Sequence, residues 1–167
     1  YFSHDRQEIV AFLPQDYQNV LEVGCGKGGF SHYLRPGCET WGIEPDRDAA
    51  KIASEKMTHV LTGRFEDVAS QLPDAYFDLV ICNDVIEHMV DHEGFLDDIK
   101  TKMKSKTCLV GSIPNVRHYR NLFELLLRKD WRYREEGILD STHLRFFTEK
   151  SLRRTMLKHD FKIEKLA

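Results

Sequence analysis

Residues 19–30 read Asn-Val-Leu-Glu-Val-Gly-Cys-Gly-Lys-Gly-Gly-Phe. The apolar run before Gly24 is typical of a strand that is buried on both faces, as in a parallel sheet. Glycines at Gly24, Gly26 and Gly28 remove side chains where the backbone must come close to a ligand. A strand that turns through glycines into a helix therefore predicts a loop that holds a nucleotide-like cofactor.

A carboxylate, Glu22, interrupts the predicted strand. Burial of an unpaired carboxylate is costly, so Glu22 is expected to orient loop amides or to contact a cationic ligand group such as an ammonium. Gly24, Gly26 and Gly29 also satisfy the G-x-G-x-x-G dinucleotide fingerprint, with Glu44 about twenty residues further on. A nicotinamide-dependent oxidoreductase is therefore an alternative, although it leaves Glu22 unexplained.

Strand and helix patterns alternate along most of the chain, which predicts a doubly wound, mostly parallel α/β sheet with helices on both faces. Ligands bind such sheets at the carboxyl ends of the strands. A helix over residues 149–158 is expected to lead into a last strand at 161–166. The other buried strands are expected at residues 19–23, 39–43, 59–62, 77–82 and 107–113.

The composition predicts a single domain over residues 1–167, because 167 residues with 41% hydrophobic side chains can form one core. A formal net charge of −3 argues against a nucleic-acid partner. No apolar stretch approaches the ~20 residues that span a bilayer, and no leader pattern is present, so a soluble cytoplasmic protein is expected. Four cysteines without C-x-x-C spacing are expected to be reduced packing residues: Cys25, Cys38, Cys82 and Cys108.

The strand at residues 77–82 is followed by the sequence Asp84-Val85-Ile86-Glu87-His88, a D-x-x-E-H motif. A late His-Leu-Arg-Phe-Phe-Thr segment follows at residues 143–148. With the glycine loop, these motifs make the chain resemble the class I methyltransferases that use S-adenosylmethionine, from about residue 19 to residue 161. The resemblance implies a Rossmann-like fold, that cofactor, and one further antiparallel strand that is absent here.

The Pro-Asn-Val-Arg-His sequence at residues 114–118 begins an insertion after the fifth strand. Members with such an insertion resemble methyltransferases among bacterial surface-saccharide and glycan-modifying proteins. The resemblance therefore implies transfer to a hydroxyl of a saccharide or small metabolite. A methyltransferase-like domain that binds cofactor without catalysis, as part of a larger glycan-assembly protein, is the non-enzyme alternative.

Cofactor contacts are expected along the carboxyl edge of the sheet. The loop amides and the following helix N-terminus suit the carboxylate of the methionine portion. By resemblance, Glu44 accepts hydrogen bonds from both ribose hydroxyls, and Phe65 offers an apolar face to adenine. The full expected set is Glu22, Gly24, Cys25, Gly26, Gly28, Glu44, Phe65, Glu66, Asn83 and Asp84.

Catalysis is assigned to His88, His143 and Asp84, since Asp84 follows the fourth strand and either imidazole could take a proton from an acceptor hydroxyl. Each histidine could equally be a packing or hydrogen-bonding group, and Asp140 is a candidate to orient His143. No cluster has metal-ligand spacing, and alkyl transfer from a sulfonium needs no metal, so no metal site is predicted. A magnesium-dependent reaction stays open.

The insertion, residues 114–147, is predicted to cover the substrate. It is rich in arginine and carries interleaved Tyr119, Trp131 and Tyr133, which suits a glycosyl or phosphorylated acceptor. The alternatives are an amphipathic cover helix with a solvated basic face, a homodimer contact through residues 119–127, or a membrane-surface contact. The acceptor contacts are assigned to Asn115, Arg117, His118, Tyr119 and Arg145.

Overall fold

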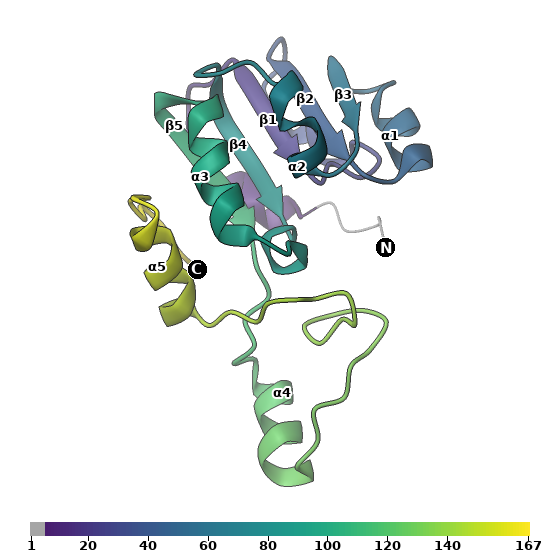
Figure 1. The fold of residues 1–167 in the computed structure, drawn as a ribbon, viewed down its shortest axis with the longest axis vertical. Coiled ribbons are helices and arrows are strands. Elements are labelled where there is room, and N and C mark those ends of the chain that lie inside the picture. Colours follow the sequence, from purple (N-terminus) through teal and green to yellow (C-terminus); the bar gives the residue numbers. More distant parts are fainter. Residues whose placement is uncertain (1–5) are drawn as a thin grey trace.

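The computed structural model describes residues 6–167 and contains one five-stranded parallel sheet in the order β3-β2-β1-β4-β5 (Figure 1). The doubly wound parallel fold predicted from the sequence is thereby confirmed. The strands are β1 (Asn19–Val23), β2 (Glu39–Glu44), β3 (His59–Thr62), β4 (Phe77–Asn83) and β5 (Met103–Ser112).

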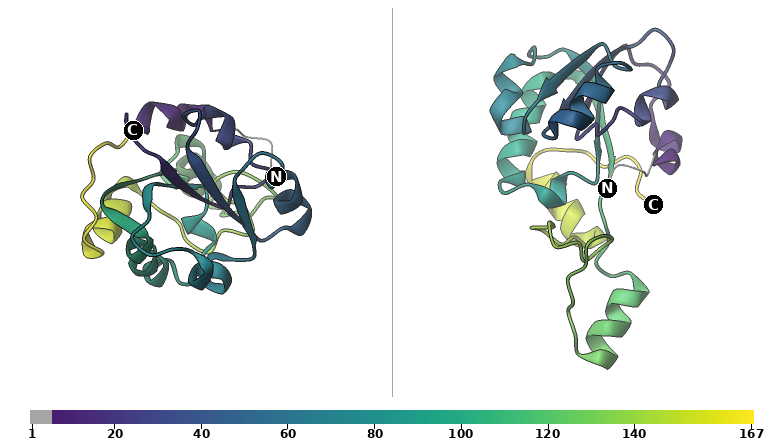
Figure 2. Two further views of the ribbon diagram at one scale, coloured as in Figure 1. Left: turned by 90° about the horizontal axis from the view of Figure 1, so that it is seen from above. Right: turned by 90° about the vertical axis from the view of Figure 1, so that its right-hand side faces the viewer.

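Helical segments connect the strands and cover both faces of the sheet, as the two views of Figure 2 show. Asp46 caps α1 by accepting a hydrogen bond from the Ala49 amide at 2.8 Å, and Thr148 begins α5 with a reciprocal capping box. The α-helices are α1 (Arg47–Ala53), α2 (Phe65–Val68), α3 (His92–Lys102), α4 (Tyr119–Phe123) and α5 (Glu149–Lys158). The 3₁₀ turns are η1 (Gln7–Phe12), η2 (Phe30–Tyr33), η3 (Ala69–Gln71) and η4 (Ile86–His88), and η5 (Glu124–Arg128) is a π-helical turn.

The core lies on both faces of the central strands because their side chains alternate. Leu21 and Val80 face the layer of α2, α3 and α5, whereas Val20 and Leu79 face η1 and η2. These four side chains are fully buried. Such complete burial on both faces explains why the strands read as continuous apolar runs.

The predicted strand at residues 161–166 is wrong, because residues 161–167 form no strand. A strand exists only through hydrogen bonds to a neighbour. Among the described residues, the sheet ends at β5, and no strand pairs with residues 161–166 to supply that ladder. The four cysteines are free, as expected, and Cys25 and Cys82 are buried. Over residues 6–167, no helix combines the length and the apolar character needed to cross a membrane.

Residues 114–134, which we call the arm, carry α4 and η5 away from the sheet (Figure 1). The apolar side chains of Phe123, Leu126 and Leu127 are exposed along it. Residues 137–148, the return segment, bring the chain back to the sheet, where Phe147 is buried in the core. The arm thus projects from the domain, while the return segment packs against it.

Candidate functional site

Parallel pairing brings the ends of four strands to one edge of the sheet. Val23 pairs with Ile43 on β2 and with Cys82 on β4, and Asn83 pairs with Ser112 on β5. The glycine loop after β1 therefore lies beside Glu44 and beside the polar residues that follow β4. This is the edge at which the sequence predicts a ligand.

The loop needs glycine because of its own backbone conformation and packing. Gly24 and Gly28 have φ values of 72° and 69°, in the left-handed region that side chains disfavour. A Cβ on Gly24 would lie 2.6 Å from Val85 Cγ2, and one on Gly28 would lie 3.2 Å from Ala53 Cα. Both glycines therefore allow close packing of the loop, in addition to any approach of a ligand.

The loop amides are already used within the protein. The Gly24 and Cys25 amides donate to the Ile43 carbonyl at 2.8 and 3.1 Å, and the Gly28 amide donates to the Cys25 carbonyl at 2.9 Å. The Gly26 amide donates to Glu44 Oε2 at 2.9 Å. The predicted role of these four amides in binding a carboxylate therefore finds no support in the geometry, and the following η2 is a single 3₁₀ turn. The loop contributes its shape instead.

Glu44 links the loop to β2. Its Oε2 accepts the Gly26 amide and its Oε1 accepts the Asp46 amide, each at 2.9 Å, and the residue is 4% exposed. Burial raises the pKa of Glu44, although the two amides favour the charged form. A carboxylate oxygen has a second lone pair, so the fixed Glu44 side chain can still accept hydrogen bonds from a diol.

Glu22 is buried deeper on β1, and its Oε2 accepts no hydrogen bond within the described residues. Burial, and then the nearby Glu44, raise the pKa of Glu22 to about 8. Because Glu44 holds the Gly26 amide, the structure favours the other predicted role of Glu22, contact with a cationic group. Asn83 Oδ1 is a second buried acceptor at this edge, and no described residue donates to it. These orphaned acceptors fit the ammonium and hydroxyl donors of S-adenosylmethionine.

We expect the ligand-free protein to lose stability as the pH rises from about 5 to about 8. Glu22 has a pKa near 4.5 in the unfolded chain and about 8 in the folded protein, so the folded state binds more protons between these values. Its contribution to the free energy of unfolding is therefore complete below pH 4.5 and is lost as the pH rises through 8. Glu22→Gln should remove this term and raise the thermal midpoint at pH 8 by about 2–4 °C per kcal/mol recovered. Thermal melts at both pH values test it, and an unchanged pH dependence in the variant would contradict it.

Asp84 follows β4 with a left-handed φ of 53°, an uncommon backbone conformation for a non-glycine residue. Its amide donates to the Ser112 carbonyl at 3.0 Å, and its Oδ1 accepts the Ser112 hydroxyl at 3.0 Å. Its Oδ2 forms an ion pair with Arg6 from the N-terminal segment. The Asp84 carboxylate is thus fixed at the strand end and neutralised by Arg6, a residue that the sequence did not single out.

Two predicted cofactor residues contribute their side chains mainly to the core. Phe65 is 4% exposed, and its ring meets Phe95 edge-on with centroids 4.8 Å apart. Cys25 packs with Ala53 and Met57. Glu66, in contrast, is exposed at the start of α2. An adenine contact from this stretch stays a prediction.

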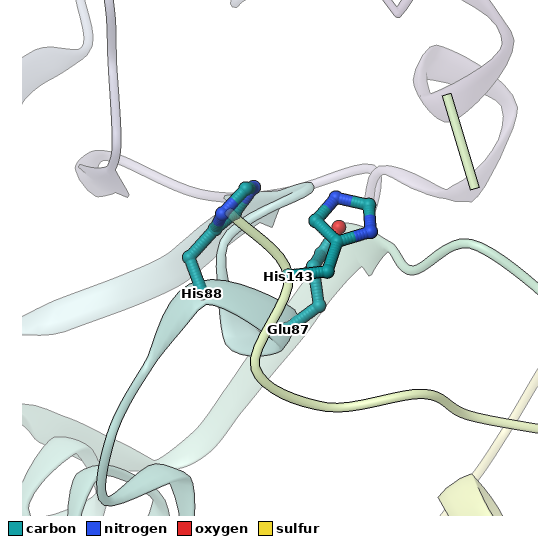
Figure 3. Close-up of side chains that lie close together, drawn as sticks. All are labelled: Glu87, His88 and His143. Carbon is teal, nitrogen blue, oxygen red and sulfur yellow. The ribbon is translucent and has the colours of Figure 1, made fainter. Parts of the chain in front are cut away.

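Three further side chains converge beside this edge. Glu87 and His88 come from η4, and His143 comes from the return segment (Figure 3). One potential ligand atom from each lies within 4.8 Å of the others, and the two imidazole centroids are 4.7 Å apart. The backbone holds this arrangement, because the Leu144 and Arg145 amides donate to the Glu87 carbonyl at 2.8 and 3.1 Å.

Hydrogen bonds orient both imidazoles. His143 Nδ1 lies 3.0 Å from the Ile138 carbonyl, so it carries the proton and donates. His88 Nδ1 lies 3.1 Å from the Thr142 hydroxyl, which donates to Asp140 at 2.6 Å. In its neutral form, each ring thus carries its lone pair on Nε2. Asp140, a predicted partner of His143, accepts the His143 amide with its carbonyl at 3.1 Å, and its carboxylate accepts the hydroxyl of Thr142 beside His88.

Burial sets the charge of this cluster. Glu87 is 1% exposed, and both carboxylate oxygens lack a hydrogen-bond partner within the described residues. Burial raises the pKa of Glu87 to about 8. Burial, and then the neighbouring His143, lower the pKa of His88, which keeps its imidazole neutral near pH 7.

The predicted acceptor residues are placed on and near the arm. Asn115 accepts the Arg117 amide at 3.0 Å, and His118 caps α4. Tyr119 is 67% exposed. Arg145 donates to the Val90 carbonyl at 2.8 Å, so it braces the turn after η4. The structure thus separates Arg145, which packs on the domain, from the others, which lie at the base of the arm.

The chain matches the family described as "Methyltransferase domain" over residues 2–166. A curated relative, the ubiquinone biosynthesis O-methyltransferase of Bradyrhizobium diazoefficiens, is 32% identical over 100 residues, covering 58% of this chain and 40% of that protein. The (S)-tetrahydroprotoberberine N-methyltransferase of Eschscholzia californica is 27% identical over 124 residues, covering 70% of this chain and 35% of that protein. The chain thus spans about two fifths or less of the length of these relatives.

Solved structures share the fold. A SAM-dependent methyltransferase from Archaeoglobus fulgidus superposes with a TM-score of 0.73 at 23% sequence identity, covering 96% of this chain and 71% of that one. This likeness agrees with the class I arrangement of the sheet. It leaves the choice of acceptor to the residues of this chain.

Proposed function

Because the chain belongs to the methyltransferase-domain family, we propose that it transfers the methyl group of S-adenosylmethionine to a hydroxyl of a saccharide or small hydroxylated metabolite. The observation that carries this proposal is the row of buried acceptors Glu22, Glu44 and Asn83 at the strand ends, next to the histidine cluster. The unsatisfied acceptors of Glu22 and Asn83 at one end, and the proton-accepting nitrogens of the histidines at the other, suit a cationic cofactor and a hydroxyl substrate.

Each of these hydrogen-bond acceptors suits one part of the cofactor. Glu44, fixed by two amides, would accept hydrogen bonds from the ribose hydroxyls. Glu22 and Asn83 would accept from the ammonium end, and the new ion pair would keep Glu22 charged. The bound cofactor supplies an electrophilic methyl group on a sulfonium. The protein's task is then to hold the acceptor in line with that methyl and to exclude water.

Proton removal is the chemical step for which the chain has its own groups. The acceptor hydroxyl gives its proton to an Nε2 lone pair of His143 or His88, both of which the Nδ1 hydrogen bonds leave in the correct tautomer. The acceptor oxygen would then take the methyl group from the bound cofactor, whose sulfur would keep the electron pair of the broken carbon–sulfur bond. The relatives named above include O- and N-methyltransferases, and these two bases favour a hydroxyl acceptor.

A saccharide acceptor is supported by the base of the arm. Tyr119 is exposed there, and the guanidinium of Arg120 lies over its ring at 5.7 Å. Aromatic faces pack on sugar rings, and guanidinium groups bind phosphate or carboxylate. A screen of sugars, sugar phosphates, phenols and amines with the purified chain tests this assignment, and turnover confined to phenols or amines would overturn it.

We expect S-adenosylhomocysteine to raise the thermal midpoint by several degrees. Ligand at about a hundred times its dissociation constant adds roughly 2.7 kcal/mol, and about 2–4 °C per kcal/mol is usual for this size. Glu44→Ala should abolish or greatly reduce this shift, measured against the variant's own ligand-free midpoint. NAD should give no shift in either protein.

The matched control is Glu39→Ala, which removes the acid at the other end of the same strand. Glu39 bonds the Trp41 indole at 2.8 Å and the Tyr76 hydroxyl at 2.9 Å, away from the glycine loop. Its loss should lower stability but preserve the ligand-induced shift. A shift only with NAD would support the nicotinamide-dependent oxidoreductase instead. Binding of S-adenosylhomocysteine without turnover in the acceptor screen would support a non-catalytic domain.

A further inference from the structure

Glu87 has a buried carboxylate for which residues 6–167 provide no hydrogen-bond partner. It is 1% exposed, and neither oxygen accepts a hydrogen bond within the described residues. Of the charged groups that act on it, Asp84 opposes its ionisation and Arg6 favours it, but Arg6 is already paired with Asp84 and Glu8. An unpaired buried carboxylate is costly, so the fold places an acceptor where an external cation would satisfy it.

The surroundings of Glu87 match those of a metal ligand. His88 and His143 each present one ring nitrogen within 4.8 Å of a Glu87 oxygen and of one another. Their Nδ1 atoms face the Thr142 hydroxyl and the Ile138 carbonyl, and Asp140 stands behind Thr142. Carbonyl and carboxylate partners on the outer nitrogen are the usual support of metal-bound histidines, since they fix the ring and its tautomer.

We propose that Glu87, His88 and His143 bind a divalent transition-metal ion of the zinc type. Two imidazoles and one carboxylate suit such an ion better than magnesium or calcium, which prefer oxygen ligands. Three protein ligands leave at least one position open, as in catalytic zinc sites. With metal–ligand bonds of about 2.0–2.2 Å, the three donor atoms, which now lie within 4.8 Å of one another, must move closer together when the ion binds.

The position of the ion would serve the proposed reaction. Glu87 and His88 follow Asp84 closely along the chain, in the turn after β4 at the ligand-binding edge of the sheet. A divalent ion lowers the pKa of a hydroxyl bound to it, which would assist the removal of the acceptor proton. This role rests on the proposed function, whereas ion binding itself can be measured without any methyl transfer.

The test is a titration of the full chain, stripped with a chelator, with Zn²⁺ alone. We expect one ion per chain, and Glu87→Gln and His143→Ala should each weaken binding at least about tenfold. His59→Ala is the matched control, because His59 pairs with Glu39 at the start of β3, away from the cluster, and should bind like the wild type. Glu87→Gln preserves the shape of the side chain, so its folding can be checked by its thermal midpoint.

A second readout is the visible absorption of bound Co²⁺, which reports coordination rather than stability. A four- or five-coordinate spectrum that is lost in Glu87→Gln would support the site. No stoichiometric binding, or equal affinity in the wild type and both ligand variants, would overturn it. Glu44→Ala separates this inference from the proposed function, because it should lose the S-adenosylhomocysteine response and still bind the ion.

Discussion

Replacing His143 by alanine is expected to lower kcat for a hydroxyl acceptor by about a hundredfold to ten-thousandfold, the usual value of general acid–base assistance. The imidazole is buried, and its Nδ1 donates to the Ile138 carbonyl, which directs Nε2 toward His88 and Glu87. The S-adenosylhomocysteine shift should persist, because His143 belongs to the return segment and not to the glycine loop. Initial rates under saturating cofactor measure the loss.

His92→Ala is the matched control for this variant. His92 begins α3 and lies beside the return segment, with its ring 5.8 Å from that of Phe147, but it is not part of the cluster. This variant shows how much kcat falls when an imidazole that only packs nearby is lost. If His143→Ala kept kcat within about threefold of the wild type, or if His92→Ala lost as much activity, the proton-transfer role would be rejected.

A double variant tests whether the two imidazoles act as one unit. Groups that act together are strongly non-additive, so His88→Ala in the His143→Ala background should cost little more. Removal of metal by a chelator distinguishes a general base from a metal ligand. If an imidazole takes the proton itself, removal of metal leaves kcat unchanged, whereas a role as metal ligands makes kcat depend on added Zn²⁺. With an amine acceptor, kcat should depend less on the imidazoles and on the metal, since an amine needs the base less.

The sheet was predictable because its information is local. Apolar runs such as residues 77–82, each followed by polar or glycine residues, identify buried strands and their carboxyl ends. The predicted strand at 161–166 was wrong for the opposite reason: its apolar pattern is local, but a strand needs a neighbour, and none pairs with it in residues 6–167. Local pattern thus predicts the element only where the topology supplies a partner.

The candidate site was predictable in part. The position of Glu44 at a strand end could be inferred from the sequence, but its hydrogen bonds to the Gly26 and Asp46 amides depend on how the loop folds. The meeting of Glu87 with His143 joins residues that no ligand spacing connects. Contacts of the folded return segment, among them its backbone bonds to the Glu87 carbonyl, bring them together. Spacing rules therefore could not predict the metal site that we propose.

Gly111→Ala is expected to destabilise the protein by more than about 4 kcal/mol, or to prevent folding. A Cβ at this position would lie 2.1 Å from the Cys82 carbonyl oxygen and 2.8 Å from its carbonyl carbon. Both atoms belong to the backbone of β4, which cannot move aside as a flexible side chain can. Losses of this size are exceptional and approach the whole stability of a typical domain. Urea denaturation measures the loss.

The control is Gly137→Ala, where a Cβ would meet no atom within 4 Å but φ is 87°. Backbone strain alone should cost about 1–2 kcal/mol there, so a larger loss in Gly111→Ala reports the steric contact. A loss below about 1 kcal/mol in Gly111→Ala would contradict the expectation and show that β4 and β5 can separate locally.

The same contact ties the fold to the site. In the register of β4 and β5, the Cys82–Gly111 pair is followed directly by the Asn83–Ser112 pair. A separation of the two strands at Gly111 would therefore displace the neighbouring site residues. The Ser112 carbonyl and hydroxyl bind Asp84, whose left-handed backbone depends on them. A Gly111→Ala protein that still folds should therefore lose both its S-adenosylhomocysteine shift and its activity, although the residue itself contacts neither cofactor nor acceptor. Retention of either would show that the orientation of Asn83 and Asp84 does not depend on the β4–β5 pairing.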